Sequence, residues 1–267
     1  MSYETLELRR EGAVAWLTLN RPGSLNALNP KLVRELRDFF GRLPEQHDVR
    51  VVVLSGAGRA FCAGLDLKEP VAEPGEEGGG PSLGMRLQRR ISEIVMLMRR
   101  APQPIIACVQ GAASGGGFAL ALASDVRLAG ESARMNAAFI RIGLSACDVG
   151  VSYFLPRIVG ASLASELLLT GRFIHAERAL ASGLVSVVVP DETLESEARK
   201  LADEMLSTSP LGLRLTKECL AMSLDAGSLE QVIAMEDRNQ VLCTQSSDMR
   251  EGMLAFLEKR APRYTGS

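Results

Sequence analysis

The sequence that decides the fold reads IIACV at residues 105–109, GGG at residues 115–117 and FALALA at residues 118–123. This order predicts a buried strand, a glycine turn and a helix. Such a turn aims backbone N–H groups and the positive end of a helix dipole at one point. That point favours negative charge, either on a phosphate or on an oxygen that becomes an oxyanion during a reaction.

A second turn of the same kind lies earlier in the chain. Residues 51–55 read VVVLS, a buried-strand pattern, and run into GAGRAFCAGLDL at residues 56–67. Small residues allow a backbone N–H to approach a ligand closely. Two such turns can supply two backbone N–H donors to one oxygen atom.

This pair of turns resembles the enoyl-CoA hydratase/isomerase family, also called the crotonase superfamily. The matching stretches are residues 20–28, 60–67, 111–117 and 251–260, so the resemblance covers nearly the whole chain. It implies an α/β fold in which ββα units wind as a spiral over residues 1–190. A helical region, residues 191–267, would follow and pack between the subunits of a homotrimer or a dimer of trimers.

The residue patterns agree with an α/β class. Alternating or continuous apolar runs predict strands at residues 4–9, 13–20, 51–55, 105–109, 126–129 and 184–189. Helical spacing of apolar residues predicts helices at residues 30–43, 82–100, 194–207, 211–222 and 229–242. The glycine-rich segment 70–81 is expected to be a surface loop, with a lid over an acyl pocket as the alternative.

The composition limits the classes of partner. The chain has 267 residues, 46% of them hydrophobic and 23% charged, with a net charge of −2. These values are typical of a globular protein and give no reason to expect nucleic acid or membrane as a partner. The N-terminus lacks a signal-peptide pattern, and the five cysteines lack metal-type spacing. We therefore expect free thiols in the cytoplasm and no metal site.

The resemblance also implies the substrate and its handle. A thioester carbonyl would lie between the Ala63 and Gly116 N–H groups, with coenzyme A as part of the substrate and no permanently bound cofactor. The residues implied to bind the thioester and coenzyme A are Arg21, Leu25, Ala27, Ala63, Gly64, Asp66, Leu67, Lys68, Gly115, Gly116 and Lys259. Lys259 would pair with a phosphate, in one reading that of a neighbouring subunit's ligand. The alternative for Lys259 is a solvated charge near the C-terminus.

An acid or base is needed as well as an oxyanion site. The two glutamates of the family's hydratase branch correspond to Ala119 and Phe139 here, and neither can move a proton. Asp148 stands where the dienoyl-CoA isomerase and chlorobenzoyl-CoA dehalogenase branches place a catalytic aspartate, although its spacing from Gly143 is one residue longer. Apolar surroundings would raise the pKa of such a carboxyl group. The alternative is an N-cap for a helix that starts near Val149.

Double-bond isomerisation, or another reaction that shuttles one proton, fits a single carboxylate better than hydration does. A hydratase with other acid or base groups is an alternative, as is a coenzyme A-binding protein with little catalysis. A serine hydrolase that uses Ser114 is a third class, and His47 and His175 are the chain's two histidines. The Gly-x-Ser-x-Gly pattern of that class lacks its first glycine here.

Overall fold

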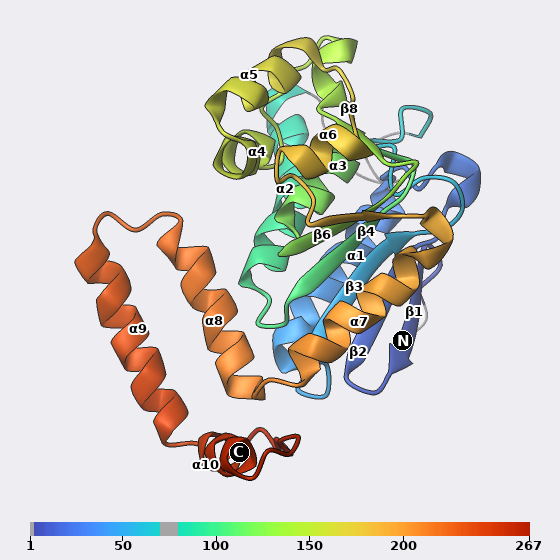
Figure 1. The fold of residues 1–267 in the computed structure, drawn as a ribbon. Coiled ribbons are helices and arrows are strands. Elements are labelled where there is room, and N and C mark those ends of the chain that lie inside the picture. Colours follow the sequence, from blue (N-terminus) through green and yellow to red (C-terminus); the bar gives the residue numbers. More distant parts are fainter. Residues whose placement is uncertain (1–2, 70–79) are drawn as a thin grey trace.

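The computed structural model describes residues 3–69 and 80–267, and six of its strands form one sheet (Figure 1). The order across this sheet is β1, β2, β3, β4, β6 and β9. The strands span Leu6–Glu11, Val14–Leu19, Val51–Gly56, Ile105–Val109, Val126–Gly130 and Val187–Val189, in that order. β1 runs antiparallel to β2, and each later pair is parallel. The carboxyl ends of β2, β3, β4, β6 and β9 therefore meet at one edge.

Helices cover both faces of the sheet. Successive strand residues point to opposite faces, so Ala15 and Leu17 join one buried cluster while Val14 and Trp16 join another. The first cluster lies under α1 (Pro30–Arg42), α2 (Gly80–Arg100) and α3 (Gly116–Ala123). The second lies under α7 (Leu194–Leu206), which crosses the sheet in Figure 1. Burial on both faces explains why these strands are almost continuously apolar.

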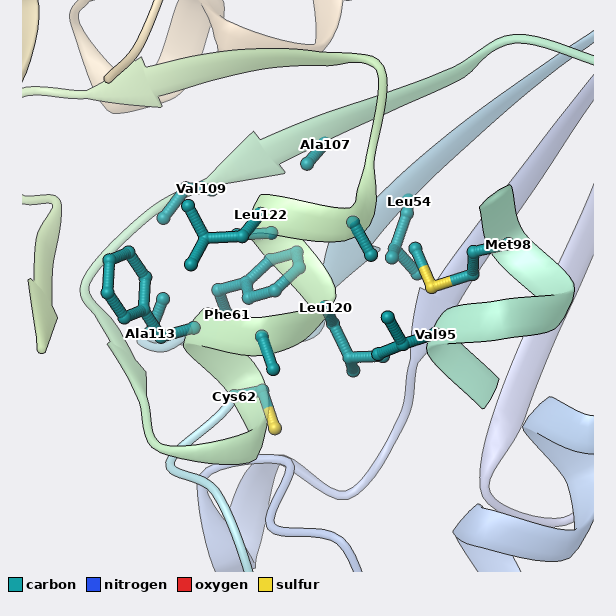
Figure 2. Packing of buried hydrophobic residues seen from close by; sticks show 14 of the residues in the cluster. Leu54, Phe61, Cys62, Val95, Met98, Ala107, Val109, Ala113, Leu120 and Leu122 are labelled. Atoms are coloured by element: carbon teal, nitrogen blue, oxygen red, sulfur yellow. The ribbon is translucent and has the colours of Figure 1, made fainter. Parts of the chain in front are cut away.

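The helix α3 lies at the centre of the molecule. All eight of its residues are buried, so it has no polar face. Figure 2 shows Leu120 and Leu122 of α3 among side chains from the sheet, from α2 and from the segment that follows β3. The labelled partners include Leu54, Phe61, Cys62, Val95, Met98, Ala107, Val109 and Ala113. Burial of each large apolar side chain stabilises the fold by about 1.5–3 kcal/mol, which fixes the helix in place.

A second, three-stranded sheet lies beside the first. It contains β5 (Ala112–Ser114), β7 (Arg134–Asn136) and β8 (Ile174–His175), in that order. β4 is followed directly by β5 and α3, and β6 by β7, so the chain repeats strand, strand and helix as it winds. The remaining helices of this part are α4 (Val151–Val159), α5 (Ala161–Thr170) and α6 (Ala176–Ala181).

The last three helices extend from the body of the molecule (Figure 1). They are α8 (Pro210–Ser223), α9 (Leu229–Thr244) and α10 (Ser247–Leu257). Each begins at a serine whose side chain accepts a backbone hydrogen bond: Ser209, Ser228 and Ser246. Many of their large apolar side chains are exposed, including Phe256 at 83% and Leu257 at 74%.

The α/β fold predicted from the sequence is confirmed, and most elements lie within two residues of the prediction. The predicted strand 184–189 is shorter, because Leu184 and Val185 are buried outside the ladder and β9 begins at Val187. The short strands β5, β7 and β8 were not predicted. α7 falls in the predicted C-terminal region but packs on the sheet, so the helices that extend away begin with α8. Residues 70–79 of the predicted loop lie outside the described residues, and the prediction is wrong for residues 80–81, which begin α2.

Candidate active site

Residues 60–66, which follow β3, lie between β5 and the loop of residues 25–28 and bond to both. On one side Cys62 donates its N–H to the Ala112 carbonyl at 3.0 Å, and the Ser114 N–H donates to the Cys62 carbonyl at 2.9 Å. On the other side the Ala63 N–H donates to the Leu25 carbonyl at 2.9 Å. The Ala63 donor is therefore already used, which contradicts its assignment from the sequence as an open donor.

The backbone N–H of Leu65, two residues after Ala63, points in the opposite direction. Leu28 donates its N–H to the Gly64 carbonyl at 2.7 Å, and the Asp66 N–H donates to the Leu28 carbonyl at 3.1 Å. These two bonds form a parallel bridge between Leu28 and Leu65. In a bridge of this kind the N–H of Leu65, which lies between Gly64 and Asp66, points away from Leu28. The Leu65 N–H consequently points toward the side on which Ser114 lies. Within residues 3–69 and 80–267, no acceptor bonds to it.

Gly116 brings the second open donor to the same place. It is the first residue of α3, where an N–H has no partner within the helix. Among the described residues no group accepts a hydrogen bond from the Gly116 N–H. A β-carbon on Gly64 would lie 3.5 Å from the Gly116 nitrogen, so the two turns are in contact. The structure therefore brings two unpaired N–H groups, those of Leu65 and Gly116, to adjoining turns.

The glycines of both turns are required by close packing. A β-carbon on Gly64 would lie 2.7 Å from the Ser114 carbonyl oxygen, and Gly64 has a φ of 94°. A β-carbon on Gly117 would lie 2.1 Å from the Cys62 carbonyl oxygen. Any side chain at either position would force the two turns apart. The same packing buries the Cys62 thiol and raises its pKa to about 12, opposed by a bond from the Gly64 N–H.

The N-terminal loop fixes the first turn through Asn26, which is fully buried. The Asn26 Nδ2 donates to the carbonyl oxygens of Ala57 and Ala60 at 2.9 Å and 2.8 Å, and its Oδ1 accepts from the Arg21 N–H at 2.9 Å. Leu25 and Asn26 both have positive φ angles, 51° and 56°. This geometry places the Leu25 carbonyl where it accepts from Ala63.

Arg21 is held by carboxylates rather than left open. Its guanidinium pairs with Asp66 at 2.9 Å and also bonds to Glu69 and to the Ala27 carbonyl. Burial would raise the pKa of Asp66, but the Lys68 N–H and Arg21 outweigh it and hold that pKa below its usual value. Leu67 and Lys68 remain exposed beside this pair. The structure thus gathers Arg21, Leu25, Ala27, Gly64 and Asp66 around one turn.

Asp148 lies in the loop before α4 and is partly buried. Its Oδ1 accepts from the Gln88 Nε2 at 2.6 Å and from the Val149 N–H at 2.8 Å. Burial raises the pKa of Asp148 above its usual value, while the Val149 N–H and Gln88 oppose the rise. The N-cap of α4 is Gly150 and has no side-chain cap bond. The alternative of Asp148 as a side-chain cap is therefore wrong.

The positions of the two hydratase glutamates are apolar and closed. Ala119 is fully buried in α3. The Phe139 ring lies 3.4 Å from where a β-carbon on Gly115 would be, so it covers the glycine turn. Neither side chain has an ionic or hydrogen-bonding group that could hold a water molecule.

In the described part of the chain, Ser114 has no histidine partner. It adjoins the two turns and is buried, while His47 and His175 are exposed. Lys259 follows α10 and is exposed, and among the described residues it makes no hydrogen bond or ion pair with Arg21 or Asp66. The described residues contain no group of three or more histidine, cysteine, aspartate or glutamate side chains placed to hold a metal ion. No described helix is long and apolar enough to span a membrane.

A largely apolar cavity of about 990 Å³ lies between α2, α4, α8 and α9. Val149 and Gly150, which directly follow Asp148, form part of its wall. Apolar side chains from α2, α4, α8 and α9 form much of the rest, including Val95, Met96, Phe154, Met222, Val232 and Met235. A largely apolar cavity therefore adjoins the loop that carries Asp148.

A family model described as enoyl-CoA hydratase/isomerase matches residues 9–267. The chain belongs to the enoyl-CoA hydratase/isomerase family. As a member of this family the protein is an enzyme. The match extends from β1 through the last helix, as the stretches quoted from the sequence suggested.

Individual relatives of the family are similar over almost the whole chain. A probable enoyl-CoA hydratase of Mycobacterium leprae is 42% identical over 92% of this chain and 85% of its own length. A 1,2-epoxyphenylacetyl-CoA isomerase of Escherichia coli is 38% identical over 96% of each chain. A crystal structure of a probable enoyl-CoA hydratase/isomerase from Mycobacterium abscessus matches with a TM-score of 0.93 and 36% identity, covering 99% of this chain and 100% of the other.

Two residues of this site were not found from the sequence. The open orientation of Leu65 depends on the pairing of Leu28 with the 64–66 segment, which no local pattern reveals. Gln88 reaches Asp148 across 60 residues of chain. The helical spacing of residues 82–100 placed Gln88 on a helix but gave no signal of its partner.

Proposed function

We propose that this family member stabilises the enolate of an acyl-CoA thioester and moves one proton with Asp148. The observation that carries the proposal is the pair of unpaired N–H groups on Leu65 and Gly116, at turns that touch through Gly64. Leu65 replaces Ala63 in this role because the Ala63 N–H bonds to Leu25. Two preorganised donors favour the charged enolate oxygen over the neutral carbonyl, and each lowers the barrier by about 3 kcal/mol.

Asp148 is the proposed proton carrier. As a carboxylate it removes the proton from the carbon next to the thioester carbonyl, and the electron pair moves onto the oxygen held by the two donors. The protonated carboxyl group then returns the same proton two carbons further along, which shifts the double bond and restores Asp148. A raised pKa suits a group that both takes and gives a proton near neutral pH.

Isomerase-type chemistry is favoured over water addition within this proposal. Water addition needs groups that position and activate a water molecule, and the two relevant positions are occupied by the apolar Ala119 and Phe139. The proposed reaction needs one carboxylate and takes up no water. The related Escherichia coli isomerase supports an isomerase assignment, whereas the Mycobacterium leprae relative has a hydratase name.

The proposed coenzyme A site is the surface around the Arg21 turn. Arg21 acts there by holding Asp66 and Glu69, since its guanidinium bonds to both. The exposed Lys68 and the exposed Lys259 of a neighbouring subunit are the proposed partners of the phosphates. The acyl chain would continue from Asp148 into the apolar cavity that starts at Val149.

A homotrimer, or a dimer of trimers, is the proposed assembly. The exposed apolar side chains of α8, α9 and α10 support it, because an apolar surface of this extent is rarely left in water. Such an assembly would also bring Lys259 of one subunit to the coenzyme A site of another.

The test is exchange of the α-protons of a saturated acyl-CoA into heavy water, followed by NMR. Wild-type protein is expected to exchange them, and Asp148→Asn to lose exchange by about 100-fold or more. Acetoacetyl-CoA, which carries an enolate-like group, serves as the matched binding control. Its absorbance should be perturbed equally by both proteins, because the backbone donors are unchanged. Full exchange by Asp148→Asn would refute the acid/base role, and an unperturbed absorbance with wild type would refute the oxyanion site.

A panel of 2-enoyl-, 3-enoyl- and dienoyl-CoA thioesters distinguishes the reactions. Conversion of a 3-enoyl thioester without uptake of water supports isomerisation. Formation of a hydroxyacyl product from a 2-enoyl thioester would instead establish a hydratase with unusual acid/base groups. Tight coenzyme A binding without turnover of any member would leave a binding protein.

A further inference from the structure

The Asp148 carboxyl group is held at only one of its two oxygens. Both the Gln88 Nε2 and the Val149 N–H donate to Oδ1, at 2.6 Å and 2.8 Å. Within the described residues no donor bonds to Oδ2. Two donors on one oxygen fix the plane of the carboxyl group, and they leave the second oxygen available for a proton.

The two donors differ in what they can control. The Val149 N–H belongs to the residue next to Asp148, so its bond ties the side chain only to its own loop. Val149 has a φ of 46°, a conformation that is unfavourable for a β-branched residue. Gln88 belongs to α2, whose buried residues Leu87, Ile94, Val95 and Met98 fix that helix. Gln88 is therefore the contact that sets the carboxyl group against the rigid core.

Within the described residues no charged group holds the Asp148 carboxyl group or shifts its pKa. The influences on the pKa of Asp148 are burial, the Val149 N–H and Gln88, and none of them is a charge. On the adjoining helices, Arg99 pairs with Asp125 and Arg157 with Asp225. Tyr153 donates to Asp225 as well, while Arg89, Arg141 and Cys147 are exposed.

We propose that Gln88 is a positioning residue for the reaction: it occupies Oδ1 of Asp148, so that Oδ2 carries the transferred proton and faces the substrate. This inference rests on the proposed acid/base role of Asp148. Gln88 touches no reacting atom and acts only through the carboxyl group. Its neutral amide suits this task, since it holds the carboxylate yet lets the carboxyl group accept a proton near neutral pH.

The test compares Gln88→Ala, Gln88→Lys and wild type in the proton-exchange assay across pH. Gln88→Ala is expected to lower kcat roughly tenfold with KM within about twofold, because binding of the thioester does not involve Gln88. The apparent pKa in its kcat profile should rise by about one unit, since a bond to the ionised form is lost. Gln88→Lys keeps a donor and adds positive charge, so its apparent pKa should fall below that of wild type. Arg89→Ala, an exposed neighbour on the same helix, is the control and should match wild type.

The outcomes separate this inference from the proposed function. If Asp148→Asn abolishes exchange while Gln88→Ala keeps the wild-type kcat and pH profile, the positioning role is wrong and the function stands. If Asp148→Asn exchanges normally, the function itself fails, whatever Gln88 does. A loss of kcat in Gln88→Ala with an unmoved pH profile and a lower unfolding temperature would show a merely structural role and also overturn the inference.

Discussion

The central sheet and the last three helices treat apolar side chains in opposite ways. Strand residues such as Val52 and Val53 are fully buried, on opposite faces, under helices of the same chain. In α8, α9 and α10 comparable side chains are exposed, among them Leu220 at 64% and Phe256 at 83%. The sheet completes its own core, whereas the helices carry an apolar surface that this chain leaves open. The difference teaches that the apolar residues of the sheet are covered within the chain, while those of α8, α9 and α10 support the proposed assembly.

Lys217 is the chief polar link between these two regions. It lies in α8, is only 6% exposed, and pairs with Asp125 at 2.7 Å. Its ammonium group also donates to the carbonyl oxygens of Met98 and Gln103, at 3.3 Å and 2.8 Å. Asp125 in turn accepts from the Ile105 N–H at 2.8 Å, at the start of β4. The α8 helix is thereby joined to the end of α2 and to the sheet.

The largest effect is expected from breaking this link. Lys217→Met removes the ammonium group from Asp125 and from the carbonyl oxygens of Met98 and Gln103, while Arg99 stays paired with Asp125, and should lower the free energy of unfolding by about 3–5 kcal/mol. The double variant Lys217→Met/Asp125→Asn removes both charges of this pair and should recover part of that loss, because the Met98 and Gln103 carbonyl oxygens still lack the Lys217 donor. Urea unfolding followed by circular dichroism measures both. Equal losses in the single and double variants would show that α8 is not held by this ion pair.

The next largest loss of stability is expected from a steric clash inside the buried core. Gly117→Ala places a β-carbon 2.1 Å from the Cys62 carbonyl oxygen, and neither backbone can move freely. We expect a loss of about 3 kcal/mol or no soluble protein. Gly84→Ala in α2 is the control, because no atom lies within 4 Å of its β-carbon, and it should be neutral or slightly stabilising. A thermal melt of both variants decides the point; a wild-type melting temperature for Gly117→Ala would contradict the packing described.

Charged side chains introduced on the exposed apolar surface of α10 should change the assembly state and leave folding unchanged. Phe256→Asp/Leu257→Asp is expected to dissociate the proposed oligomer, with a dissociation constant raised 100-fold or more, and to leave the core intact. Leu169→Asp is the matched control, since Leu169 is 78% exposed but lies in α5, outside the last three helices. Sedimentation velocity gives the assembly state. Unchanged sedimentation of the double variant would exclude α10 from the interface.

The smallest expected effect on stability comes from the partly buried carboxyl group of Asp148. Burial raises the pKa of Asp148 in the folded protein above its unfolded value of 3.8. Below that pH the carboxyl group is protonated in both states and costs nothing; as the pH rises through the folded pKa, its charge destabilises the folded state. Asp148→Asn should therefore raise the free energy of unfolding at pH 7 by less than about 1 kcal/mol, because solvent screens a half-buried group. The gain should vanish near pH 3, and a gain that persists there would have another cause.

The sequence predicted the fold well because the decisive patterns are local. The run 105–109 and the three glycines after it define a strand, a turn and a helix without reference to distant residues. The short strands β5, β7 and β8 were missed, since segments of two or three residues acquire their pairing only from neighbours that are distant in the chain. The site shows the same limit. Gly116 was chosen by the start of a helix, whereas the choice between Ala63 and Leu65 depends on the register of residues 25–28.

Asn26 makes the turn that carries the Leu65 N–H vulnerable to the replacement of one nitrogen atom by oxygen. Hydrolysis of its amide to a carboxylate during ageing would replace Nδ2, a donor to Ala57 and Ala60, by an oxygen that repels both carbonyl groups. The charge would be buried, because Asn26 is inaccessible to solvent. Tight enclosure also slows that hydrolysis by restricting water and backbone motion. Opening of this loop would therefore be needed before water could reach the Asn26 amide.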